Sequence, residues 1–176
     1  SWEESTGQGD AYFTWVYGCQ AVELTVNRKT GKVKLLNAWA AHDVGRAINP
    51  QSVEGQIEGG VAQGIGYALL EEMKLDQGRV VNPDFLDYRI PTAADVAPVE
   101  SILVEPIDPQ GPFGAKSIGE TALVPTAAAI ANAIYDAIGV RMTDLPMTPD
   151  RILIALREKA RPGSGQTGDH RPSTAM

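Results

Sequence analysis

Glu120 is the residue whose type and setting are best suited to chemistry. It ends the stretch Gly-Pro-Phe-Gly-Ala-Lys-Ser-Ile-Gly-Glu at residues 111–120, in which three glycines occur. Glycine permits tight turns and lets another molecule approach the backbone closely. A carboxylate held at such a place can act as a general base. An acid near a helix start also suits the helix dipole, so Glu120 alone leaves a purely structural interpretation open.

A second polar group, Gln56, lies in a stretch that is unusually rich in glycine. Five glycines occur within residues 55–66, where hydrophobic residues recur at helical spacing. Each glycine costs a helix about 1 kcal/mol relative to alanine. We therefore predict that the backbone here is packed closely against other backbone or against a bound molecule. The amide of Gln56 can both donate and accept hydrogen bonds to such a molecule.

Composition and spacing argue against other kinds of site. The glycines of residues 55–66 lack the full dinucleotide-binding spacing, and no phosphate-binding Gly-Lys-Ser/Thr motif is present. The net charge of −7 and the aromatic content of 6% argue against a nucleic-acid partner. His42 and His170 are the only histidines, so we interpret His42 as a loop or packing residue and expect no side-chain metal ligands.

The cysteine content indicates a cellular compartment. Cys19 is the single cysteine, and without a histidine partner set we interpret it as a small buried strand residue. One cysteine cannot form an internal disulfide, which favours a reducing compartment and predicts a cytoplasmic protein. The sequence contains no apolar run of about 18 residues and no recognisable signal peptide, so no membrane span is expected.

These groups need a scaffold, and hydrophobic periodicity predicts an α+β fold. Alternation predicts a β-hairpin from residues 12–26 and 33–41, joined by a turn at Gly31. Residues 42–50 are expected to leave the hairpin as a loop. The remaining expected elements are a glycine-rich helix at 55–73, two short extended pieces around a turn at 76–78, an irregular segment at 82–99, a short strand at 101–105, a helix at 120–138 that becomes regular near Pro125, a strand or extended link at 140–145 and a helix at 149–160.

One domain is expected over residues 1–160, followed by a flexible tail at 161–176 that has no apolar pattern. The fold class is thus a β-hairpin, a glycine-rich helix, irregular segments and two C-terminal helices.

Three motifs, in this order and spacing, resemble a known family. They are His-Asp-Val-Gly-Arg-Ala-Ile-Asn-Pro at 42–50, Gly-Gln-Ile-Glu-Gly-Gly with Gln-Gly-Ile-Gly at 55–66, and Gly-Ala-Lys-Ser-Ile-Gly-Glu at 114–120. Together they resemble the C-terminal part of the molybdenum-binding subunit of the xanthine dehydrogenase/aldehyde oxidase family. The resemblance covers roughly residues 7 to 160 and is more specific for the family than for a substrate.

The resemblance implies a catalytic base and a cofactor site. Glu120 takes the position of the family's base, and Gln56 that of a glutamine that lies against the molybdenum–pterin cofactor. Lys116, Ser117, Ile118 and Gly119 surround the base and are expected to contact the cofactor or shape the loop. The metal would be held by the pterin dithiolene, in the cytosine dinucleotide form, and by no side chain of this chain.

The resemblance also implies partners and a reaction. Partner chains would carry the N-terminal portion of the molybdenum subunit, the 2Fe-2S clusters and FAD, because one cysteine cannot ligate a cluster. The chain would be inactive without them, as a separate subunit of a hetero-oligomer, a cleaved product or a fragment. The expected reaction is hydroxylation of an N-heteroaromatic of purine or nicotinate type with water as oxygen source. The alternatives are an aldehyde or aromatic-CoA substrate, or a structural subunit without a catalytic residue.

Overall fold

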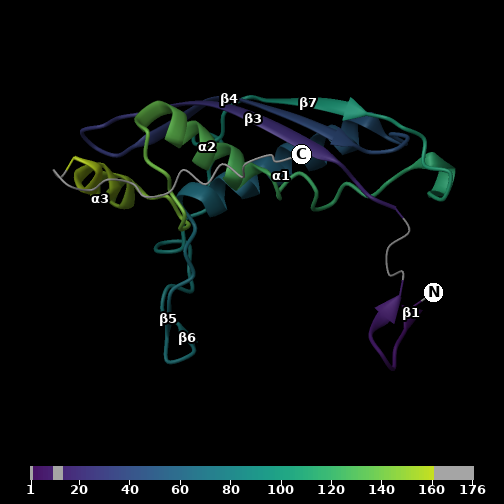
Figure 1. Ribbon diagram of the computed structural model, residues 1–176, viewed down its shortest axis with the longest axis horizontal. Coiled ribbons are helices and arrows are strands. Elements are labelled where there is room, and N and C mark those ends of the chain that lie inside the picture. The colour runs from purple at the N-terminus through teal and green to yellow at the C-terminus, as the bar shows by residue number, and fades with distance from the viewer. Residues whose placement is uncertain (1, 10–13, 161–176) are drawn as a thin grey trace, which may run out of the picture.

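A three-stranded sheet forms the centre of the fold, which the computed structural model describes for residues 2–9 and 14–160. Strand β3 (Gly18–Val26) pairs antiparallel with β4 (Val33–Asp43), and β4 pairs parallel with β7 (Val99–Val104). The strand order is β3-β4-β7, so the long β4 is central. Figure 1 shows the sheet along the top of the molecule with α1 and α2 beneath it.

The β3–β4 hairpin forms because hydrophobic residues alternate along both strands and give the sheet one apolar face. Its turn requires glycine at position 31. Gly31 has a φ of 73°, and a Cβ atom there would lie 2.0 Å from the carbonyl oxygen of Pro149. The tip of the hairpin therefore lies directly against the start of the last helix.

The helices begin and end at recognisable signals. The side-chain oxygen of Asn49 accepts a hydrogen bond from the Ser52 amide at 3.1 Å and caps the first helix. Gly139, with a φ of 65°, ends the second helix in the left-handed conformation. The α-helices of residues 14–160 are α1 (Pro50–Leu69), α2 (Thr126–Ile138) and α3 (Pro149–Lys159).

Two of the α1 glycines let α1 approach α2 and the turn before it. A Cβ atom at Gly60 would lie 2.7 Å from the Cβ of Ala122, and one at Gly64 would lie 2.4 Å from the Cβ of Thr126. The predicted close packing against the glycine-rich helix is confirmed at these two positions. The core between sheet and helices includes Leu35, Ala38, Ala40, Ile57, Val61, Ile65, Ile130, Ile134, Ile138 and Ile152.

Short elements complete the described chain. Two small hairpins project from the molecule on the side away from the sheet (Figure 1). Among residues 2–9 and 14–160, no helix combines the length and apolar character needed to cross a membrane. The short elements are β1 (Trp2–Glu3), β2 (Gln8–Gly9), β5 (Leu75–Asp76), β6 (Arg79–Val80) and the 3-10 helix η1 (Pro112–Gly114).

The predicted α+β class is confirmed, but several strand predictions need correction. Strand β4 runs to Asp43, so the expected loop does not begin at His42. Pairing with β7 extends the strand, because His42 and Asp43 lie opposite Leu103 and Val104. Cys19 lies on β3 as predicted but is exposed, since it points away from the helices.

The strand and helix boundaries also differ from the predictions. The first hairpin strand begins at Gly18; residues 14–17 are not in it, and 12 and 13 lie outside the described residues. Helix α1 starts at Pro50 and ends at Leu69, because the Asn49 cap starts it earlier than periodicity indicates. Helix α2 is regular from Thr126 to Ile138, as the position of Pro125 predicted, since proline cannot occupy a helix interior. Residues 140–145 form an extended link without a strand, and the tail at 161–176 lies outside the described residues.

Candidate functional site

The loop that leads to Glu120 is attached to the end of β4. The Lys116 amide donates to the Val44 carbonyl at 3.0 Å, and the Arg46 amide donates to the Gly114 carbonyl at 2.7 Å. Gly45, with a φ of 57°, lies so close that its Cβ would be 2.4 Å from the Gly114 oxygen. Two of the three sequence motifs are therefore joined by backbone hydrogen bonds in the folded chain.

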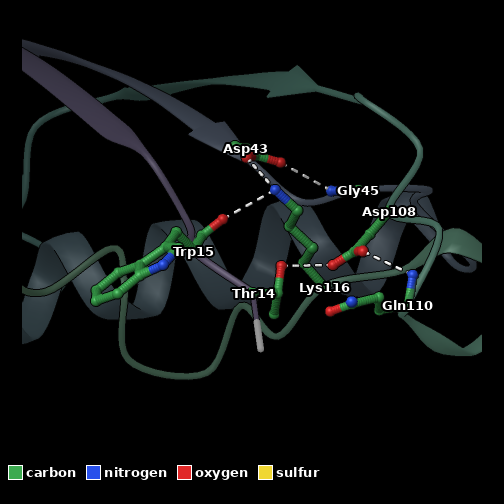
Figure 2. Close-up of polar contacts among 7 residues, drawn as sticks. All are labelled: Thr14, Trp15, Asp43, Gly45, Asp108, Gln110 and Lys116. Carbon is green, nitrogen blue, oxygen red and sulfur yellow. Dashed lines mark hydrogen bonds and ion pairs between the residues drawn. The ribbon is translucent and has the colours of Figure 1, made fainter. Parts of the chain in front are cut away.

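A nearly buried ion pair strengthens this junction. Lys116 Nζ lies 2.6 Å from Asp43 Oδ2, and the two side chains are only 11% and 7% exposed. Nζ also donates to the Trp15 carbonyl at 2.9 Å, and Asp43 Oδ1 accepts from the Gly45 amide at 3.1 Å. Figure 2 shows the Lys116 side chain directed at Asp43 and Trp15. The charge of Lys116, a predicted cofactor contact, is thus used to hold its own loop.

Asp108 is a buried acid of this loop that the sequence did not single out. Its carboxylate accepts hydrogen bonds from Thr14 Oγ1 and from the Gln110 amide (Figure 2). The hydrogen bond from Thr14 and then that from the Gln110 amide hold the pKa of Asp108 below its ordinary value. The Asp-Pro-Gln sequence at 108–110 is a turn signal that could have indicated the local bond. Its partner Thr14 is distant in sequence, and no sequence pattern indicates that the two residues meet.

Glu120 itself is exposed and lies in the turn before α2. The Leu123 amide donates to its carbonyl at 3.1 Å, which closes the turn. Ile118 packs its half-buried side chain against the core, whereas Ser117 and Gly119 are exposed. The Glu120 carboxylate is thus exposed, whereas the segment that carries it is held to the protein by the packing of Ile118 and by the closed turn.

Gln56 is exposed on α1, on the side of the helix that meets this turn. It precedes Gly60 by four residues and so shares its face of the helix, and Gly60 packs against Ala122. Added Cβ atoms at Gly55, Gly59 and Gly119 would meet nothing within 4 Å. The fold thus brings Gln56 and the Glu120 turn to neighbouring surfaces with open glycine backbone around them.

The remaining candidates from the sequence are His42 and the possible metal ligands. His42 is fully buried on β4, and burial lowers its pKa. This confirms the interpretation of His42 as a packing residue, although on a strand instead of in a loop. Within residues 2–9 and 14–160, no group of three His, Cys, Asp or Glu side chains is arranged to hold a metal ion.

Comparison with known proteins identifies the fold. The structure of quinoline 2-oxidoreductase from Pseudomonas putida superposes on this chain with a TM-score of 0.76 and 37% sequence identity. The match covers 80% of this chain and 18% of the quinoline 2-oxidoreductase chain. The xanthine dehydrogenase molybdenum-binding subunit of Escherichia coli is 46% identical over 77% of this chain, and the aldehyde oxidoreductase molybdenum-binding subunit PaoC of that species is 39% identical over 75%. The fold is thus of the class found in molybdenum-dependent oxidoreductases.

The family follows from a match at residues 1–97 to the molybdopterin cofactor-binding domain. The chain therefore belongs to the molybdopterin cofactor-binding domain family, which confirms the resemblance predicted from the three motifs. It spans 18% of the length of each of the two Escherichia coli relatives. The match to the xanthine dehydrogenase subunit spans 77% of the 176 residues. A stretch of that length contains position 120 whichever residue it starts from.

Proposed function

We propose that this chain is the base-bearing part of a molybdenum hydroxylase, with Glu120 as the catalytic base. The observation that carries the proposal is the exposed carboxylate on a turn that packs against Gly60 of α1, preceded by the nearly buried Asp43–Lys116 pair. A structural or assembly subunit without its own catalytic residue is the contrasting reading. It has no need for an acid held outward on an anchored loop.

Open glycine backbone supports the placement of a pterin cofactor here. Gly55, Gly59 and Gly119 leave room that a side chain would fill, and the exposed Gln56 amide can donate to and accept from a polar ring system. Bound there, a molybdenum–pterin cofactor supplies the two-electron oxidation and the transfer of oxygen from water. Gln56 orients the group. Ser117, Ile118 and Gly119 shape the loop beside it, and Lys116 holds that loop through Asp43.

Glu120 then moves one proton. Its carboxylate oxygen takes up the proton released as oxygen derived from water bonds to the electron-poor substrate carbon. The short closed turn fixes where the Glu120 backbone lies, which limits the positions that its carboxylate can reach.

We propose an N-heteroaromatic of purine or nicotinate type as the substrate. Two relatives support this class: the xanthine dehydrogenase subunit, at 46% identity, and quinoline 2-oxidoreductase, at 37%. An aldehyde is the second candidate, favoured by the 39% identity to the aldehyde oxidoreductase subunit. Comparing purines, nicotinate and aldehydes as substrates of the whole complex separates the two classes.

Further partners complete the proposed enzyme. The remainder of the molybdenum-binding polypeptide, an iron–sulfur chain with 2Fe-2S clusters and a flavin chain with FAD would form a cytoplasmic hetero-oligomer around this chain. Two observations support this: the chain covers only 18% of two related subunits, and its one cysteine cannot ligate a cluster. The cytosine dinucleotide form of the cofactor remains part of the proposal.

Replacement of the base tests the function directly. We expect Glu120→Gln in the assembled complex to lower kcat by about 10²- to 10⁴-fold, since general-base catalysis contributes that much. Molybdenum content and assembly should stay as in the unmodified complex. Glu100→Gln, at an exposed acid on β7, is the matched control and should keep normal turnover. Near-normal turnover of Glu120→Gln would show that the base lies elsewhere.

A further inference from the structure

We propose that Gln20, on β3, is a positioning residue that holds the Glu120 turn from its far side. This inference rests on the proposed role of Glu120 as the base. Gln20 is distant from that turn in sequence and belongs to none of the three motifs. Its side chain nevertheless reaches the backbone two residues beyond Glu120.

A small polar network inside the fold makes this contact. Gln20 Nε2 donates to the Ala122 carbonyl at 2.6 Å, and Thr126 Oγ1 donates to Gln20 Oε1 at 2.7 Å. Gln20 Nε2 also lies 3.2 Å from His42 Nε2. Ala122, Thr126 and His42 are all fully buried. Gln20 thus connects the sheet to both ends of the segment between Glu120 and α2.

Counting donors and acceptors shows why glutamine is needed. The amide of Gln20 has two N–H donors and one oxygen acceptor. One donor serves the Ala122 carbonyl, the other meets His42 Nε2, and the oxygen accepts from Thr126. The Thr126 hydroxyl has one hydrogen, so it cannot serve Gln20 and the Ala122 carbonyl, 3.0 Å away, at the same time. Without Gln20, at least one buried polar atom of the network is left without a partner.

The packing around the network leaves the turn little freedom. Gly60 and Gly64 of α1 lie against Ala122 and Thr126 so closely that added Cβ atoms would overlap them. Gln20 therefore holds the segment from the sheet side while α1 blocks it from the other side. On the chain before Glu120, the Asp43–Lys116 pair provides the second attachment. Glu120 lies between these two attachments, and its exposed side chain is held only through the backbone.

Steady-state kinetics of the assembled complex tests the proposal. Gln20→Leu should lower kcat by about ten- to a hundredfold, because a small misplacement of a reacting group costs that much. Its KM and its molybdenum per complex should stay unchanged. Gln20→Glu keeps the acceptor for Thr126 but loses the donor to Ala122, so it should lose turnover similarly. Thr25→Val, at an exposed position of the same strand, is the control and should behave as the unmodified complex.

Thr126 supplies an independent pair of variants. Thr126→Ser keeps the hydroxyl and should retain near-normal kcat, whereas Thr126→Val should lose turnover as Gln20→Leu does. Hydrogen exchange should be faster over residues 118–126 in Gln20→Leu, since the turn is released. In a Glu120→Gln background, Gln20→Leu should cause no further fall in kcat, because Gln20 acts through Glu120.

Several results would overturn the inference. These are a normal kcat in Gln20→Leu, a fall in kcat that only follows lost molybdenum, or the same fall in the Glu120→Gln background. If Gln20→Leu fails to assemble, equal kcat in Thr126→Ser and Thr126→Val overturns it instead. The proposed function fails separately, through near-normal turnover of Glu120→Gln alone.

Discussion

At the scale of single residues, buried polar side chains at the end of β4 determine where the loop lies. His42 and Asp43 are neighbours in sequence, yet each holds a different part of the chain. Asp43 pairs with Lys116 at 2.6 Å, and His42 meets Gln20 at 3.2 Å. A nearly buried charge needs its partner, because removing one member leaves the other desolvated and unpaired. Asp43 therefore ties the loop to the sheet directly, whereas His42 contacts Gln20 of the neighbouring strand, whose amide reaches the Ala122 carbonyl.

The buried His42 predicts a pH dependence of stability. Burial lowers its pKa from the ordinary value of 6.5, so the folded chain binds this proton less readily than the unfolded chain. The stabilisation is complete above the unfolded pKa and is lost as the pH falls below about 6.5. Urea titrations at pH 7.5 and 5.5 should show a larger loss of unfolding free energy on acidification for the unmodified protein than for His42→Gln. Equal losses would show that another group causes the effect.

At the scale of elements, four of the five glycines of α1 form two pairs with different surroundings, and the fifth, Gly66, lies against Glu71 and Pro91. Gly60 and Gly64 face Ala122 and Thr126 at distances that exclude a side chain, whereas Gly55 and Gly59 face open space. The helix accepts the cost of glycine at the first pair because it gains close packing. At the second pair the fold itself gives no reason for glycine, which fits the proposed cofactor surface.

Alanine substitutions separate the two sets. Gly64→Ala should lower the unfolding free energy of the cofactor-free polypeptide by up to about 2 kcal/mol, because overpacking costs about 1–3 kcal/mol and helix propensity returns about 1. Gly59→Ala is the matched control and should raise stability by up to about 1 kcal/mol. Urea denaturation measures both. An equal effect of the two substitutions would contradict the packing described between α1 and α2.

At the scale of the whole molecule, the proposed site lies on an open surface. Gln56 and Glu120 are both exposed. Large hydrophobic side chains such as Phe85, Phe113 and Val124 are also more than three-quarters exposed. Exposed apolar surface of this kind marks places where further protein packs. Both features agree with a chain that spans 18% of two related subunits.

The isolated chain is therefore expected to hold no cofactor. Metal analysis should find no molybdenum above background in the purified chain, whereas the assembled complex should contain it. The physical reason is that an open surface provides few of the contacts that immobilise a cofactor. The assembled complex that carries Glu120→Gln should contain as much molybdenum as the unmodified complex. Stoichiometric molybdenum in the isolated chain would contradict the proposed division of the site.

The sequence by itself determined the elements and the family. Alternation gave the hairpin, the glycines at 31 and 139 marked a turn and a helix end, and the three motifs indicated a molybdopterin-binding chain. The roles of Glu120 and Gln56 at its site stay a proposal. These features depend on residues close together in the chain, whose spacing reflects local geometry. The motif order was also readable, because it needs no knowledge of contacts.

Only the tertiary structure decided how the site is held. Parallel pairing with β7 extended β4 to Asp43, which brought that acid to Lys116. The contact of Gln20 with Ala122 joins residues far apart in sequence, and so does that of Thr14 with Asp108. Such partners leave no periodic signal, because they depend on which strands lie side by side and on how closely α1 approaches α2. Side-chain type shows that a polar group needs a partner, but only the fold determines which one it finds.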